Sequence, residues 1–142
     1  MKRDYANYQV ALKLFLKRGN KILFLKLPES GLWDLPGGRI DNVETHTPLR
    51  KILAREIREE LGVKVKYELG KPLFQFRRKA LSRKTYNLLT VYEGRYLSGE
   101  IKLSSEHASY EWINPKAYKF KEKDFMSKEE YLAFIEYFSK YY

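Results

Sequence analysis

Apolar and polar residues alternate near the start of the chain in the pattern of a β-strand. The alternating apolar positions are Val10, Leu12, Leu14 and Leu16. Because side chains two residues apart point to the same face of a strand, residues 8–17 are predicted to form one. Arg18-Gly19-Asn20 has the composition of a turn, and residues 21–27 are again apolar. The two segments together predict a β-hairpin.

Proline and glycine interrupt this pattern twice before the middle of the chain. They do so at residues 28–31 and 35–38, which leaves at most a short extended segment over residues 32–34. Further along, segments rich in aromatic and β-branched residues predict more strands. These segments are residues 63–76, 86–96 and 108–113. The basic run Arg77–Lys84, which separates the first two, is predicted to be a loop.

The apolar period lengthens to four residues between residues 48 and 61, as expected for a helix. The repeated positions are Leu49, Leu53, Ile57 and Leu61. Thr47 is the predicted N-cap, Pro48 lies in the first turn, and Gly62 is the predicted stop. Residues 127–142 predict a second helix, whose apolar face is Tyr131, Phe134, Ile135 and Phe138. These elements indicate one α+β domain over residues 1–142.

Composition and charge narrow the class of protein. The chain has 142 residues, of which 44% are hydrophobic and 32% charged, and it has no apolar run long enough to span a bilayer. The polar N-terminal segment lacks the apolar core of a secretory signal, so we expect a cytoplasmic protein. The absence of cysteine excludes disulfides, thiolate zinc sites and a cysteine nucleophile. The net charge of +10 favours anionic ligands, although lysine-rich surfaces also confer solubility.

Glutamates share one side of the predicted mid-chain helix. At 100° per residue, Glu56, Glu59 and Glu60 fall within an arc of about 100°. A cation would relieve their mutual repulsion, and clustered carboxylates suit Mg²⁺ or Mn²⁺. Taken alone, however, such a helix surface is more often a solvated face with local ion pairs.

The surrounding sequence changes that interpretation. Leu35-Pro36-Gly37-Gly38 precedes the helix, Glu44 follows Gly38 after five residues, and residues 55–63 read Arg-Glu-Ile-Arg-Glu-Glu-Leu-Gly-Val. This combination resembles the signature of the Nudix hydrolase family, in which a glycine, a glutamate and an Arg-Glu-x-x-Glu-Glu-x-Gly segment follow one another. The resemblance implies the family's α/β/α sandwich around a mixed β-sheet.

The resemblance also implies a metal-dependent mechanism. It assigns Mg²⁺, or Mn²⁺ in its place, to a set of ligands made up of Glu56, Glu59, Glu60, Gly38 and Glu106. One of these carboxylates would accept the proton of the attacking water, and Arg55 would hold a helix glutamate in position. Glu106 is assigned from its place just ahead of the predicted strand that carries Trp112.

The spacing departs from the family pattern at one point. Ten residues separate Glu44 from Arg55, where the family has seven. Because Pro48 favours a helix start at that position, we place the extra residues in the loop just after Glu44. The helix glutamates then keep their register. Glu44 is predicted to be displaced from the site and dispensable.

The resemblance implies a nucleotide-type substrate that contains a nucleoside diphosphate. A nucleoside triphosphate or an oxidised nucleotide is favoured, and ADP-ribose, another nucleotide sugar or a dinucleoside polyphosphate are the alternatives. A catalytically silent domain that binds nucleotide or RNA is an alternative of another class. The full set of helix glutamates argues against it.

The remaining polar residues give weaker predictions. Arg77, Arg78 and Arg83 in the basic run are expected to bind the substrate's phosphates, since exposed cations attract anionic ligands. His46 and His107, the only histidines, are expected in plain surface or loop roles. No membrane partner is expected, RNA is a less favoured partner, and a homodimer is left open.

Overall fold

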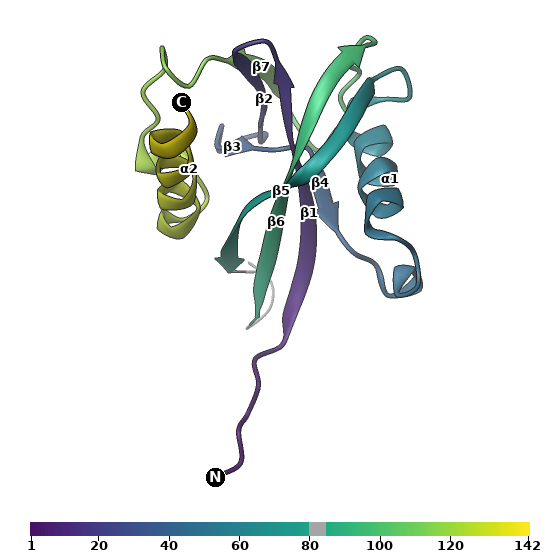
Figure 1. The fold of residues 1–142 in the computed structure, drawn as a ribbon, viewed down its shortest axis with the longest axis vertical. Helices are drawn as coiled ribbons and strands as arrows, with labels where there is room; N and C mark the ends of the chain where they lie inside the picture. Colours follow the sequence, from purple (N-terminus) through teal and green to yellow (C-terminus); the bar gives the residue numbers. More distant parts are fainter. Residues whose placement is uncertain (80–84) are drawn as a thin grey trace.

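A computed structural model describes residues 1–79 and 85–142 of the chain as a mixed β-sheet with helices on both faces. The order of elements is β1 (Tyr8–Arg18), β2 (Lys21–Lys26), β3 (Trp33–Asp34), β4 (Gly37–Arg39), η1 (Asn42–Glu44), α1 (Leu49–Leu61), β5 (Lys66–Lys79), β6 (Tyr86–Ser98), β7 (Ser109–Ile113), η2 (Glu122–Asp124) and α2 (Lys128–Tyr141). Figure 1 shows α1 and α2 on opposite sides of the sheet, and residues 1–7 extending away from it. The predicted sandwich is confirmed.

Strand β1 is the centre of the sheet. The main path runs β3-β2-β1-β6-β5, while β4 pairs with β1 and β7 pairs with β2. Strand β1 is parallel to β6 and antiparallel to both β2 and β4. The predicted hairpin of β1 and β2 is present, and the parallel pair makes the sheet mixed, as expected.

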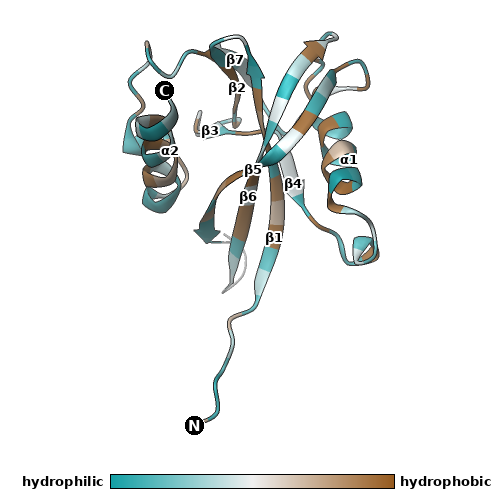
Figure 2. Cartoon of the chain, in the orientation of Figure 1, coloured by the Kyte–Doolittle hydropathy of each residue, from teal (hydrophilic) through white to brown (hydrophobic). Residues whose placement is uncertain are grey.

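Each face of β1 packs against a different helix. Leu12, Leu14 and Leu16 belong to a core that includes Ile52, Leu53 and Ile57 of α1. Ala11 and Phe15 belong to a second core that includes Phe134 and Phe138 of α2. Both faces of the strand are therefore buried, which explains why its polar alternation is weak. Figure 2 shows the apolar residues of the central strands and of the inner helix faces.

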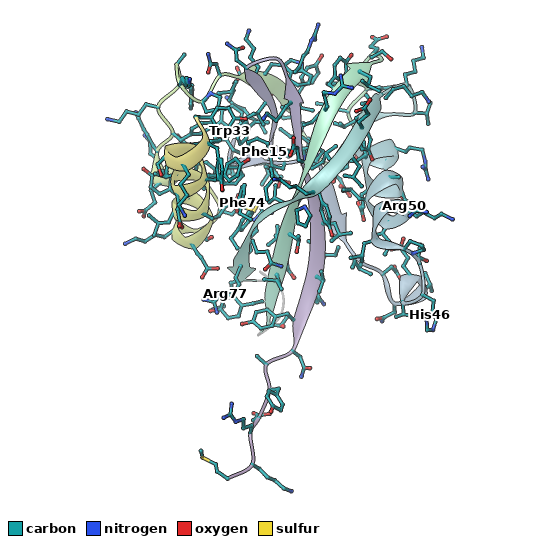
Figure 3. All side chains as sticks on the ribbon, viewed as in Figure 1. Phe15, Trp33, His46, Arg50, Phe74 and Arg77 are labelled. Atoms are coloured by element: carbon teal, nitrogen blue, oxygen red, sulfur yellow. The ribbon has the colours of Figure 1, made fainter. Side chains whose placement is uncertain are left out.

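The core under α2 is largely aromatic. The ring of Phe134 lies 5.2 Å from that of Phe74 and 5.7 Å from that of Phe24, between centroids. Figure 3 shows Phe15, Trp33 and Phe74 between the sheet and α2, whereas His46 and Arg50 point outward on the α1 side. Each such buried ring stabilises the fold by roughly 1.5–3 kcal/mol relative to an exposed one. This core anchors α2 to the sheet.

Helix α1 begins one residue later than its predicted N-cap implies. Its N-cap is Pro48 rather than Thr47, and no side chain caps this end. The backbone oxygen of Pro48 accepts hydrogen bonds from Lys51 and Ile52, while the Thr47 N–H donates to the oxygen of Glu44. Thr47 is therefore held in the preceding turn. Gly62 ends the helix with a positive φ of 91°, as predicted.

Two segments are more regular than their composition predicts. Pairing with β6 continues to the register Lys79↔Tyr86, so Arg77 and Arg78 belong to β5 and not to a loop. The Gly37-Gly38 segment forms strand β4 against β1. A Cβ on Gly37, whose φ is +134°, would lie 2.0 Å from the oxygen of Leu12. Glycine is thus required for this close pairing.

No helix within residues 1–79 or 85–142 is both long and apolar enough to cross a membrane.

Candidate active site

A cleft of about 1090 Å³ opens beside the C-terminal half of α1. Its walls come from the start of β1, from β4 and the loop after it, and from residues 104–107. Glu56, Glu59 and Glu60 all line it. The structure therefore brings together the helix glutamates that the sequence predicted, and it places Gly38 and Glu106 in the same cleft.

The backbone of β4 contacts two of these glutamates. The N–H of Gly37 donates to Oε2 of Glu60 at 2.8 Å. A Cβ on Gly38 would lie 2.4 Å from Oε2 of Glu56, so only glycine lets this carboxylate reach the strand. Gly38, which was predicted to approach the metal, thus lies close to the carboxylate of Glu56, a predicted metal ligand. The backbone groups that face charged side chains belong to Gly37, whose oxygen accepts from Lys13 at 3.0 Å.

Burial raises the pKa of two of these carboxylates. Glu60 is 4% exposed, and its burial raises the pKa to about 7, against partial opposition from Lys13 and the Gly37 N–H. Burial also raises the pKa of Glu56, although neighbouring Arg55 opposes it. A divalent cation would supply a positive charge beside Glu56 and Glu60, and it would favour their ionised forms.

Arg55 is the cation closest to the cluster. Its guanidinium lies 3.0 Å from Glu56 and 3.1 Å from Glu59, the latter one helical turn away. Its Nε and Nη2 also donate to Glu44, at 2.7 Å and 2.6 Å. The role predicted for Arg55, to hold a helix glutamate, agrees with these contacts.

The structure places Glu44 against Arg55, and Glu44 is not among the residues that line the cleft. Glu44 closes η1 with a capping box, in which its carboxylate accepts from the Asp41 N–H at 3.0 Å. This compact turn returns the loop to α1, so Glu44 reaches Arg55 in spite of the longer spacing. The extra residues are accommodated without moving Glu44 away. That Glu44 is dispensable stays a prediction.

Glu106 is held at the cleft by a loop that is fastened to the end of α1. The N–H of Lys102 donates to the oxygen of Leu61 at 2.8 Å, and that of Ser104 to the oxygen of Glu60 at 3.2 Å. These bonds use helix-terminal carbonyls, which have no partner within the helix. The exposed side chain of Glu106 therefore lines the same cleft as the helix glutamates.

Comparison with known proteins agrees with this arrangement. The family model of the NUDIX domain matches residues 7–134, which is most of the chain. The chain belongs to the Nudix family. It is accordingly an enzyme of the Nudix hydrolase type. A search of curated proteins finds no match.

Solved structures show how far the likeness extends. A MutT protein from Methanosarcina mazei superposes with a TM-score of 0.73 at 23% identity, covering 97% of this chain and 95% of that one. A MutT NUDIX hydrolase from Burkholderia pseudomallei gives 0.66 at 26% identity, with coverage of 81% and 89%. An ADP-ribose pyrophosphatase from Streptococcus suis gives 0.57 at 21% identity, with coverage of 85% and 79%. This chain therefore shares its fold with MutT proteins and with a protein described as an ADP-ribose pyrophosphatase.

The Nudix domain also contains a buried charge network that the sequence did not predict. Asp34, in the cleft wall, lies 3.2 Å from Lys13, 3.0 Å from Arg78 and 3.1 Å from Nε2 of His107. Although burial opposes ionisation, Lys13, Arg78 and the His107 hydrogen bond hold the pKa of Asp34 well below its usual range. Arg78 donates onward to Glu130 of α2 at 2.5 Å and 2.9 Å. The network joins the cleft wall to α2.

The structure also shows where the histidines and the basic run lie. His107 is buried and bonded to Asp34, so it is not a plain surface residue, whereas His46 is exposed as expected. Arg78 is enclosed, with a side chain 12% exposed. Arg77 is exposed, but its guanidinium is paired with Glu129 at 2.7 Å. Neither arginine lines the cleft, and Arg83 lies outside the described residues.

The donor set of the Nudix domain fits a divalent metal in its chemistry. Carboxylate and backbone oxygens are the ligands that Mg²⁺ and Mn²⁺ prefer, and the cleft offers both. Within the two described ranges, no three acidic or histidine side chains already converge at coordination distance. Arg55 holds Glu56 and Glu59. A metal would therefore have to draw these carboxylates away from the guanidinium.

Proposed function

We propose that this Nudix enzyme hydrolyses a phosphoanhydride bond in a nucleoside-diphosphate-linked compound, with Mg²⁺ or Mn²⁺ as its metal. A nucleoside triphosphate or an oxidised nucleotide is the favoured substrate. The observation that carries the proposal is the buried carboxylate of Glu60, whose pKa burial raises to about 7, in a cleft that Glu56 and Glu59 share. Buried carboxylates of this kind are stabilised by a cation.

Different residues of the cleft would bind the metal and accept the proton. Glu56, Glu59 and Glu60 would hold the metal, together with Glu106, which lines the same cleft. Bound metal neutralises phosphate charge and makes water a better nucleophile. Arg55 would release the glutamates to the metal and stay anchored by Glu44. A carboxylate that remains free of the metal, Glu106 among them, would accept the proton of the attacking water.

The substrate's base and sugar would occupy the outer cleft. Tyr8, Gln9 and Arg39 line that part of it, and Arg39 donates to Gln9 at 2.8 Å. Tyr8 is the aromatic residue among the described cleft-lining side chains, and an aromatic ring can stack on a base. The cleft is large enough for a nucleotide. Its polar lining does not by itself choose among nucleotides, so the substrate requires a direct test.

That test is a hydrolysis panel with and without Mg²⁺. The panel contains canonical and oxidised nucleoside triphosphates, ADP-ribose, UDP-glucose and a dinucleoside tetraphosphate, and the products are separated by chromatography. We expect Mg²⁺-dependent release of pyrophosphate or of a nucleoside monophosphate, fastest with a triphosphate. Faster cleavage of ADP-ribose or the dinucleotide would transfer the assignment to those substrates.

The same panel tests the silent alternative. Binding of nucleotide or of a short RNA without any metal-dependent hydrolysis would contradict the proposal and support a binding domain. Glu68→Gln is the matched control for variants of the helix glutamates, because Glu68 is an exposed β5 residue paired with Arg95, outside the cleft. It should hydrolyse the preferred nucleotide at the wild-type rate.

A further inference from the structure

Lys13 is a buried cation in the cleft wall, and the reaction proposed above gives it no part. Its side chain is 6% exposed. The ammonium nitrogen lies 3.0 Å from the oxygen of Gly37, 3.1 Å from the oxygen of Leu35 and 3.2 Å from Oδ1 of Asp34. A lysine ammonium has three N–H donors. These three partners can therefore satisfy it completely.

All three partners belong to the segment of residues 34–37 that leads from β3 into β4. The same segment contacts the glutamates of α1. Gly37 donates its N–H to Glu60, and the neighbouring glycine allows Glu56 to pack against the backbone. Lys13 thus fixes the piece of chain against which two proposed metal ligands rest.

We propose that Lys13 is a positioning residue of this site: its hydrogen bonds fix the 34–37 segment so that Glu56 and Glu60 keep the geometry needed to bind a divalent metal. The inference rests on the proposed function. It assigns Lys13 no contact with substrate, and it explains why a lysine lies among the buried apolar residues of β1.

Two effects of Lys13 on a bound metal have opposite signs. Its positive charge repels a cation, whereas its hydrogen bonds order the cation's ligands. Asp34 lies 3.2 Å from the ammonium and cancels much of its field at longer range. Removal of the lysine would leave two backbone oxygens in the cleft wall without their charged donor. The ordering effect should therefore dominate, and loss of Lys13 should weaken metal binding.

The lack of cysteine in this chain permits a precise chemical test. In the variant Lys13→Cys, the single thiolate displaces bromide from 2-bromoethylamine in the unfolded protein, which gives a side chain of nearly lysine length that ends in an ammonium. Treatment with 1-iodopropane gives a side chain of the same length that ends in a methyl group. The two adducts differ in charge and hydrogen bonding but not in length. Wild type taken through the same alkylation and refolding is the control.

The measurements are the Mn²⁺ dissociation constant, by electron paramagnetic resonance, and kcat and KM for the nucleotide that wild type hydrolyses. We expect the propyl adduct and Lys13→Met to bind Mn²⁺ about fivefold more weakly or worse. Their kcat should fall about tenfold or more, with KM within about threefold. The aminoethyl adduct should return both quantities to within about threefold of wild type.

Other outcomes overturn the inference. Equal recovery with both adducts would show that Lys13 only fills space. Unchanged or tighter Mn²⁺ binding in Lys13→Met would show that its hydrogen bonds do not order the ligands. Lys13→Met needs no chemical treatment, so it decides the case in which neither adduct refolds. A wild-type protein that binds no Mn²⁺ would overturn the proposed function as well, whereas wild-type binding with an unaffected Lys13→Met would overturn this inference alone.

Discussion

Asp34 and Glu60 are both buried carboxylates in the wall of one cleft, but their surroundings are opposite. Asp34 is in contact with Lys13, Arg78 and His107, and its pKa lies well below the usual range in spite of burial. Glu60 accepts a backbone N–H, and burial raises its pKa to about 7. A buried carboxylate that is directly paired with protein cations completes a structural network. One whose direct partner is a backbone N–H is suited to an external cation, and this difference separates the network from the proposed site.

The largest effect on stability is expected from a mutation that breaks the buried network where it reaches α2. Arg78 pairs with the buried Glu130, and Arg77 pairs with the exposed Glu129, so the same mutation can be made at adjacent positions. Glu130→Gln should lower the free energy of unfolding by about 3 kcal/mol, because the buried guanidinium of Arg78 then loses one of its two carboxylate partners. Glu129→Gln should stay close to wild type. Urea unfolding at pH 7 measures both, and equal losses would show that burial does not distinguish the two pairs.

The second test is at the site itself. Glu60→Gln and Glu59→Gln remove a proposed ligand charge, and each should lower kcat about a hundredfold or more, or about 2.7 kcal/mol of transition-state stabilisation. Glu60→Gln should leave urea unfolding near neutral pH no weaker than wild type, because the neutral amide needs no cation. Steady-state hydrolysis at matched Mg²⁺ concentration measures the loss, with Glu68→Gln as control. Wild-type rates in both folded variants would refute the assignment of the helix glutamates.

Glu44 should have an intermediate effect. It contacts Arg55 and not the cleft, so Glu44→Gln should loosen the guanidinium without removing a metal ligand. We expect kcat to fall about tenfold, and the loss from Glu56→Gln under the same conditions to be larger. A loss in Glu44→Gln as large as that in Glu56→Gln would place Glu44 among the ligands. No loss at all would support the prediction from spacing that Glu44 is dispensable.

The smallest expected effect is on the pH dependence of stability in the absence of divalent metal. The pKa of Glu60 is raised from its ordinary value of 4.5 to about 7, so the folded state binds this proton more tightly than the unfolded state. The stability that it contributes is present below about pH 4.5 and is lost as the pH rises through about 7. The raised pKa values of Glu56 and Glu130 act in the same direction.

Comparison with Glu60→Gln isolates the share of Glu60. Between about pH 6 and 7.5 in EDTA, wild type should lose about 1 kcal/mol more than the variant. The lowered pKa of Asp34 has the opposite sign, since its contribution is lost as the pH falls below about 4, outside this window. Parallel pH profiles for wild type and variant would show that the pKa of Glu60 is not raised in the folded protein.

The α1 site was predictable from the sequence because its information is local. The period of four fixed the buried face of the helix, and the spacing from Gly38 through Glu60 carried the family signature. Glu56, Glu59 and Glu60 therefore lie where the sequence predicted. The fate of Glu44 was not predictable, because a loop's length does not fix its path. The capping box of η1 returns it to Arg55.

The buried network was not predictable because its partners are distant in sequence. Asp34 lies 44 residues from Arg78 and 73 from His107, and Arg78 lies 52 from Glu130. Sheet register and the docking of α2 bring them together. One signal was available, because Lys13 is the single polar residue in the run of residues 10–16, which is otherwise apolar on both faces of the strand. A lysine at such a position has to meet buried acceptors.

A titration with Mn²⁺ in the absence of nucleotide tests directly whether the α1 carboxylates form a divalent metal site. Wild type, Glu60→Gln and Glu68→Gln are titrated with Mn²⁺ and followed by electron paramagnetic resonance. We predict that wild type and Glu68→Gln bind Mn²⁺ alike, that Mg²⁺ competes, and that Glu60→Gln binds about tenfold more weakly or worse. Equal binding by wild type and a folded Glu60→Gln, or no binding by wild type, would contradict it.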